Sequence, residues 1–306
     1  MGLFTNNKKL CPVCNNPTPR IFPTSVEGIP ICKECNRKVD LPEGALKEMS
    51  IAEFRQYIDF WMENKTLRDV FTENLRFVPG YETDNLLIDT GHALFRLKDD
   101  NNSLVFEDSN LVSFQILEDG EPIFESAGNT LKCYKSDIPE RVKTMSDQIA
   151  QLAIQQQVNE EVERLERERQ RERERNGEKE TQPTYYSRPE IELPIPLDYF
   201  YVDLTLNHPY WGEFHGKKYG PRFKRDNPSV ADYLNQYQAT IDKLHKMAAA
   251  MMKIINPGAR EVVVGAGTAA PAADAVNEIK RYKELMDAGV ITEAEFAAKK
   301  RQLLGI

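Results

Sequence analysis

Four of the five cysteines lie in two C-x-x-C pairs near the start of the chain. Cys11 and Cys14 form the pair CPVC, Cys32 and Cys35 form the pair CKEC, and seventeen residues separate the pairs. This spacing is typical of a zinc site built from two pairs of ligands. Two short turns can present four thiolates at the corners of a tetrahedron, which is the geometry that zinc adopts in structural sites. The sequence therefore predicts structural Zn²⁺ bound by these four cysteines.

Folding energetics favour a metal over the alternative of two disulfides. A segment of about 40 residues buries too little apolar surface to be stable alone. Metal binding, which is worth on the order of 10–16 kcal/mol in small zinc peptides at neutral pH, would supply the missing stability. Disulfides persist in oxidising compartments, and the N-terminal stretch MGLFTNNKKL lacks the apolar segment of a secretion signal. We expect a cytoplasmic protein with a zinc ribbon or knuckle over residues 1–40.

The composition limits which functional classes fit this protein. A chain of 306 residues is long enough for two or three folded units. It is 41% hydrophobic and carries a formal net charge of −8. The longest apolar runs, such as 199–206, are far shorter than the roughly 20 residues of a membrane-spanning helix, so no transmembrane segment is predicted. The acidic balance argues against nucleic-acid binding by the whole molecule. The N-terminal module is locally basic, however, through Lys8, Lys9, Arg20, Lys33, Arg37 and Lys38.

Those cations leave two interpretations open. They could contact nucleic acid, or they could offset the negative field of a zinc ion bound by four thiolates. The second interpretation is favoured, because it needs no partner.

The segments that follow must position this module. Residues 41–74 are predicted to form a helical connector, because Ser50 and Glu53 form a capping box ahead of apolar side chains at helical spacing. Residues 75–138 change to short alternating runs bounded by turn residues. This pattern predicts a β-meander, which we interpret as the first half of a small split β-barrel.

Strand signals resume in residues 191–256, which are predicted to hold the second half of the barrel and a closing helix. Asn227 and Pro228 are interpreted as the start of that helix, whose apolar residues then step by four and three without a break. Such a stripe fits a helix that closes one end of a barrel, and it also fits the seam of a coiled-coil dimer. The nearby strands favour the closing helix.

Residues 139–190 interrupt the predicted barrel with a charged helical insertion. Its first part has apolar residues at heptad steps, and its second part is nearly pure Glu and Arg. Pairs of opposite charge three or four residues apart can keep such a helix folded while it is fully solvated. The insertion is predicted to project into solvent, and a short coiled coil formed by its first part is the alternative.

The C-terminal part is predicted to be a linker followed by a helical hairpin. Residues 257–273 include EVVVGAGTAAP, which resembles a phosphate-binding loop but leaves too few residues for the αβ unit that such a loop requires. We interpret this stretch as a flexible linker. Residues 274–306 form the predicted hairpin, which buries too little to be stable alone and must pack on something, such as copies of itself. The predicted oligomerisation residues are Ile279, Tyr282, Leu285, Met286, Phe296, Leu303 and Leu304.

The hairpin sequence EIKRYKELMDAGVITEAEFAAKKRQLLG closely resembles the SHOCT (short C-terminal) domain. The four-cysteine N-terminus, the SIAEF helix and the strands ending in FQILEDG resemble a bacterial and phage family of zinc-ribbon-like modules of unknown function. The resemblance implies a pleckstrin-homology-like small barrel in the middle of the chain. Family members often carry a Gly-rich apolar insert between the barrel halves, and the Glu/Arg helix found here instead argues against a membrane role inferred from that insert.

A search for catalytic residues finds no recognisable arrangement. The chain has no GxSxG motif and no Walker loop. The histidines, His92, His208, His215 and His245, show none of the close spacings that predict a second metal site. Cys133 is interpreted as a lone buried thiol. The sequence therefore predicts no enzyme activity.

Together these observations predict a multi-module α+β protein that acts as a zinc-stabilised, non-enzymatic scaffold or adaptor. It is expected to form a homo-oligomer, or to dock an unidentified protein, through the C-terminal hairpin. A phage or prophage origin would fit the resemblance. The alternatives are a nucleic-acid-associated regulator that uses the basic zinc module, and a membrane-peripheral adaptor that uses the pleckstrin-homology-like middle.

Overall fold

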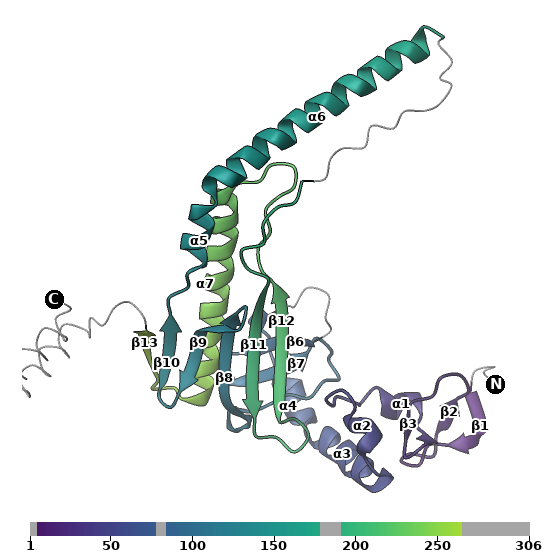
Figure 1. The fold of residues 1–306 in the computed structure, drawn as a ribbon. Coiled ribbons are helices and arrows are strands. Elements are labelled where there is room, and N and C mark those ends of the chain that lie inside the picture. The colour runs from purple at the N-terminus through teal and green to yellow at the C-terminus, as the bar shows by residue number, and fades with distance from the viewer. Residues whose placement is uncertain (1–4, 78–83, 178–190, 265–306) are drawn as a thin grey trace, which may run out of the picture.

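The computed structural model describes residues 5–77, 84–177 and 191–264. Figure 1 shows a mixed α+β molecule with the small N-terminal module at one end, the larger sheets in the middle and a long helix that projects away from them. The N-terminal module consists of β1 (Thr5–Leu10), β2 (Pro17–Pro19), β3 (Ser25–Val26), β4 (Ile29–Pro30), α1 (Lys33–Asn36) and α2 (Ala45–Glu48).

Two helices connect the N-terminal module to the sheets, α3 (Ile51–Glu63) and α4 (Lys65–Val70). The predicted capping box at the start of α3 is confirmed, because the Ser50 hydroxyl accepts from the Glu53 backbone N–H and the Glu53 carboxylate accepts from the Ser50 N–H. The helix buries Phe54, Tyr57 and Ile58. Its buried face therefore comes from the apolar spacing that the sequence shows.

The predicted meander forms parts of two sheets. The smaller sheet has the order β5-β6-β7, and the larger has the order β12-β11-β8-β9-β10-β13. In the described residues no strand pairing joins these two sheets into a closed barrel, so the pleckstrin-homology-like barrel stays a prediction. Their strands are β5 (Leu75–Phe77), β6 (Asp84–Asp89), β7 (Leu94–Lys98), β8 (Leu111–Glu118), β9 (Glu121–Ala127), β10 (Thr130–Tyr134), β11 (Tyr199–Leu206), β12 (Glu213–Tyr219) and β13 (Arg260–Val264); a 3₁₀ turn, η1 (Asp108–Asn110), precedes β8.

The larger sheet is discontinuous in sequence. After β10 the chain leaves through the helices α5 (Ile138–Thr144) and α6 (Ser146–Arg175), and it returns as β11, which pairs antiparallel with β8. Figure 1 shows α6 extending away from the sheets. Its last two turns carry only exposed residues in the described part, and pairs such as Arg169 with Glu166 line its surface. Each exposed pair contributes only a few tenths of a kcal/mol.

The long helix α7 (Val230–Ile255) packs on the sheets. It contacts β5, β8, β9 and β10, and Figure 1 shows it lying along the larger sheet. Its N-cap is Ser229, whose hydroxyl accepts from the Asp232 N–H, and not the predicted Asn227. Its apolar face is covered by its own chain, including Tyr237 and Leu244, which favours the closing-helix interpretation over the dimer seam.

The last described strand differs from the sequence prediction. The predicted linker over 257–273 begins inside the fold, because Arg260–Val264 forms β13 and pairs in parallel with β10 along five residues of each strand. The valines of this segment favour a strand, but the glycines that follow them made the sequence pattern typical of a linker. Residues 265–273 and the predicted hairpin lie outside the described residues.

A buried carboxyl group links the larger sheet to its covering helices. Glu118 at the end of β8 is 5% exposed and accepts hydrogen bonds from the Ser136 hydroxyl at 2.5 Å and from the Tyr237 hydroxyl at 2.5 Å. Burial raises the pKa of Glu118 above its usual value, although both hydrogen bonds act to lower it. The folded state therefore holds a proton here at pH values where the unfolded chain has lost it.

The raised pKa of Glu118 predicts a pH-dependent effect of Glu118→Gln. The stability linked to the carboxyl proton is fully present below the ordinary pKa of 4.5 and is lost as pH rises through the folded-state pKa. Glutamine keeps a neutral group at every pH, so the variant should gain stability relative to the natural protein as pH rises above that value. Urea unfolding at a series of pH values from 4 to 7 measures this difference. Glu121→Gln, at an exposed position, should show no such trend, and a pH-independent difference for Glu118→Gln would contradict the assignment.

Candidate metal centre

Two turns and one short helix bring the predicted zinc ligands together. Cys11 follows β1, Cys14 lies in the next turn, Cys32 is the N-cap of α1 and Cys35 lies within α1. Their sulfur atoms all lie within 4.8 Å of one another. Cys11, Cys32 and Cys35 are buried, and Cys14 is exposed. The structure therefore brings all the predicted ligands to one place.

The sulfur spacing suits a tetrahedral metal site. The Sγ atoms of Cys11 and Cys35 are 3.7 Å apart, those of Cys14 and Cys32 are 3.3 Å apart, and those of Cys14 and Cys35 are 3.6 Å apart. A tetrahedron with metal–sulfur bonds of about 2.3 Å has sulfur–sulfur edges of about 3.8 Å. A disulfide bond would need about 2.05 Å. The sulfurs are placed as ligands and not as bonded pairs.

The electrostatics of the cluster suit a bound cation. Burial opposes ionisation of Cys11, but hydrogen bonds from backbone groups of Cys32, Cys14 and Val13 lower its pKa to about 7. Burial raises the pKa of Cys32, and burial together with the neighbouring thiols raises that of Cys35. Four thiolates so close together would repel one another strongly unless a cation compensated their charge. A divalent ion with affinity for sulfur supplies that compensation.

The module is held against α3 by polar contacts. The Arg55 guanidinium donates to the carbonyl oxygen of Pro12, which lies within the first cysteine pair, at 2.5 Å. The Ile51 N–H donates to the Glu27 carboxylate at 3.0 Å. These contacts fix the cysteine turns relative to the helical connector.

The other predicted site lies outside the described residues. All the predicted oligomerisation residues belong to the stretch 265–306, so their placement stays a prediction.

Two histidines near the WGEFHG segment do not share a site. His215 Nδ1 lies 3.1 Å from the Asp203 carboxylate, and its Nε2 lies 3.4 Å from Glu213 on the same hairpin. Hydrogen bonding to Asp203 raises the pKa of His215. His208 packs instead among aromatic rings, and burial lowers its pKa to about 4. Neither histidine belongs to a group of three or more candidate metal ligands among the described residues.

Sequence reasoning missed a second cluster. Cys133 on β10, His245 on α7 and Glu261 on β13 bring one ligand atom each within 4.8 Å of one another. Cys133 is therefore not the lone thiol that the sequence suggested. No sequence signal was available, because the three residues come from three elements and 128 positions separate the first from the last.

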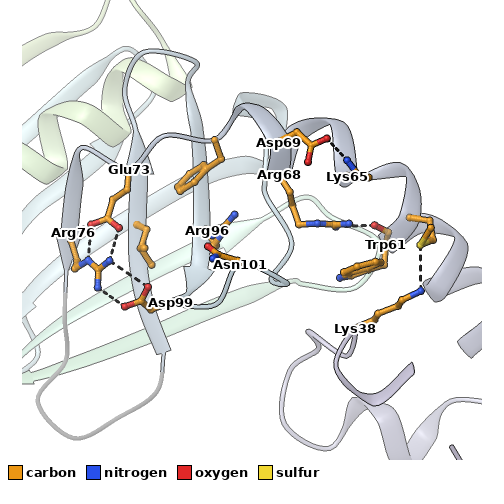
Figure 2. Close-up of a pocket in the computed structure, with 13 residues that line it drawn as sticks. Lys38, Trp61, Lys65, Arg68, Asp69, Glu73, Arg76, Arg96, Asp99 and Asn101 are labelled. Atoms are coloured by element: carbon orange, nitrogen blue, oxygen red, sulfur yellow. Dashed lines mark hydrogen bonds and ion pairs between the residues drawn. The ribbon is translucent and has the colours of Figure 1, made fainter. Parts of the chain in front are cut away.

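A cavity of about 690 Å³ lies between α3, α4 and the smaller sheet. Figure 2 shows Arg76 held between Glu73 and Asp99 at one end of this cavity. Lys65 is paired with Asp69 in a similar way. These contacts pair the charges of Arg76 and Lys65 with carboxylates.

The opposite end of this cavity holds cations packed on aromatic rings. The Arg68 guanidinium lies 3.8 Å and the Lys38 ammonium 5.0 Å from the centre of the Trp61 ring. Arg96 is 6% exposed, and its Nε has no hydrogen-bond partner in the described structure. The described lining has no serine, threonine, cysteine, histidine or tyrosine, but it includes the amines of Lys38 and Lys65 and the carboxylates of Asp69, Glu73 and Asp99.

Comparison with known proteins identifies one segment. Residues 277–304 match the family model described as "Short C-terminal domain" (SHOCT), which confirms the resemblance seen in the sequence. No curated protein and no solved structure matches the chain significantly. None of the described helices is both long enough and apolar enough to cross a membrane.

Proposed function

We propose that this chain is a non-enzymatic scaffold or adaptor whose N-terminal module is stabilised by Zn²⁺ and whose SHOCT domain mediates self-association. The proposal rests on the combination of a four-sulfur cluster with a SHOCT segment in one chain. A four-sulfur cluster lies in a module too small to fold alone, and a short SHOCT segment lies at the opposite end. Both small units gain stability from a partner, which is a metal ion for the first and another protein surface for the second.

Zinc is favoured over other metals by the donor set. Four thiolates at tetrahedral spacing fill every coordination position, which is typical of structural zinc and leaves no position for a substrate or an activated water. The proposed activity is therefore binding and assembly, in the cytoplasm.

Self-association is tested by removing the SHOCT segment. We expect the full chain to be a dimer or larger in light scattering coupled to gel filtration, and a chain ending at Val264 to be monomeric. This end point preserves β13, which pairs with β10, so the sheet stays complete. A shorter chain would expose the edge of β10 and confuse the result.

A full-length variant controls for the truncation. Leu303→Asp places a charge on the predicted apolar face of the second hairpin helix and should lower the mass as the truncation does. Lys299→Asp changes a charged position of the same segment and should leave the mass unchanged. Equal masses for the full chain and the chain ending at Val264 would rule out self-association through this segment.

One observation favours a second candidate, a nucleic-acid-associated regulator. Lys38 belongs to the basic N-terminal module and also lines the cavity in Figure 2, where Arg68 and Arg96 supply further positive charge. Salt-dependent binding of a single-stranded oligonucleotide, lost when Lys9, Lys33 and Lys38 are replaced by alanine, would support it. Absence of binding at low salt would remove it.

A further inference from the structure

The cluster of Cys133, His245 and Glu261 has the atoms and spacing of a metal site. The Cys133 thiol donates a hydrogen bond to Glu261 Oε1 at 3.4 Å, and His245 Nε2 lies 3.0 Å from the same oxygen. A tetrahedral zinc ion bound by sulfur, nitrogen and oxygen gives a sulfur–oxygen edge of about 3.6 Å and a nitrogen–oxygen edge of about 3.4 Å. The observed distances are within a few tenths of an ångström of these edges.

The sheet register explains why the three side chains meet. Leu131 of β10 is opposite Glu261 of β13, and Cys133 is two residues further along β10. Because side chains alternate across a strand, Leu131, Cys133 and Glu261 share one face of the sheet. The helix α7 packs on β10 and brings His245 to that face. The site therefore depends on the parallel pairing of β13, which is formed by the chain just before the SHOCT segment.

The contact between His245 and Glu261 fits two ligands of one metal ion better than a simple hydrogen bond. Its Nε2 is shielded from solvent and, although it lies 3.0 Å from Glu261 Oε1, it makes no hydrogen bond of acceptable geometry. Ligand atoms around a metal point to the ion and not to one another, which produces close contacts that lack hydrogen-bond angles. The Phe124 ring, 5.3 Å from the imidazole centre, helps to hold the ring in place.

The local electrostatics argue against a free reactive cysteine. Burial, and secondarily the neighbouring Glu261, raise the pKa of Cys133 to about 12. A thiol in this position is neutral at pH 7 and a poor nucleophile unless a cation binds and displaces its proton.

We propose that Cys133, His245 and Glu261 bind a second zinc-class divalent cation, with three protein ligands and a fourth position for water or a further donor. Mixed sulfur, nitrogen and oxygen donors suit Zn²⁺ better than Ca²⁺ or Mg²⁺, which require oxygen. The ion would fasten β13 to β10 and α7. This site is separate from the four-cysteine centre in sequence and in composition of ligands.

The test measures metal content and affinity on the full chain. After loading with zinc and extensive dialysis, the natural protein should retain two equivalents per chain. Cys133→Ala and Glu261→Gln should each weaken the affinity of one equivalent at least tenfold in competition with a zinc-binding dye. Asp242→Asn, which changes an exposed carboxylate of α7 three residues before His245, should keep both equivalents.

Cobalt substitution separates the two centres. A variant in which Cys11, Cys14, Cys32 and Cys35 are all replaced by alanine should retain a cobalt site with a weak thiolate-to-metal absorption band from one sulfur, and adding Cys133→Ala should remove that band. Glu261 is exposed on an edge strand, so its variant should fold and still report on the site even if Cys133→Ala does not fold. Retention of only one equivalent by the natural protein, or of two equivalents by both Cys133→Ala and Glu261→Gln, would overturn the proposal.

Discussion

Cys35→Ser is expected to unfold the N-terminal module while the two larger sheets stay folded. Cys35 is 3% exposed, and its sulfur is within 3.7 Å of Cys11 and within 3.6 Å of Cys14. A serine hydroxyl is a poor zinc ligand and would leave the remaining thiolates with an incomplete tetrahedron. Because binding free energy in such a module is folding free energy, on the order of 10–16 kcal/mol in zinc peptides, losing one ligand removes most of its stability.

Hydrogen exchange localises the effect of Cys35→Ser. Backbone amides that the module protects, such as Ile31 N–H bonded to Thr24 O and Asn36 N–H bonded to Cys32 O, should exchange much faster in the variant. Amides in β8 and β11 should keep their protection, because these strands pair with each other and β8 also packs on α7. The same sample should lose one equivalent of zinc.

Cys133→Ser is the matched control, since it is the same substitution at another buried cysteine. Exchange within residues 26–36 should be unchanged by it, whatever its effect on metal bound near β13. Slow exchange of these amides in Cys35→Ser, with zinc fully retained, would show that the four cysteines are not the metal ligands that hold the module.

Local signals explain what could be predicted from the sequence. The cysteine spacing and the Ser50–Glu53 capping box each act over a few residues, so the sequence displays them directly. The start of α7 was misplaced by two residues because Asn227-Pro228 and Ser229 both offer capping chemistry, and only packing selects Ser229.

Non-local pairing explains what could not be predicted. The β13 segment is predicted as a linker because a glycine-rich stretch follows it directly. It forms a strand because it pairs with the edge of β10, which lies about 130 positions earlier in the chain. The Cys133 cluster depends on that same pairing. Asp40 is a third example, because an ordinary acidic residue near the end of the cysteine module becomes a buried junction only when three distant segments meet around it.

Asp40 joins the cysteine module to the rest of the molecule. It is 2% exposed, and its carboxylate accepts from the Leu104 N–H at 2.7 Å and lies 3.1 Å from the Lys98 ammonium. Its backbone N–H donates to the Tyr57 hydroxyl at 2.7 Å, and its carbonyl accepts from the Trp211 indole at 3.1 Å. One residue thus contacts α3, β7 and the loop between β11 and β12.

Asp40→Ala is expected to lower the free energy of unfolding by about 3 kcal/mol, because it leaves a buried backbone donor and an ammonium group without their acceptor. The estimate is at the low end for a broken buried pair, since Lys98 keeps 29% of its side chain exposed and can regain water. Asp40→Asn retains an acceptor for the Leu104 N–H and should cost about 1–2 kcal/mol. Urea unfolding measures both values.

The position of Asp40 predicts a separation between stability and metal binding. None of its contacts involves a cysteine ligand, so zinc content should be unchanged in Asp40→Ala. Asp59→Ala, on the exposed face of α3, should change stability by less than about 0.5 kcal/mol. Loss of zinc together with stability would mean that the module folds only when docked on the sheets. Loss of stability alone would mean that the metal holds the module and that Asp40 fixes its orientation on the sheets.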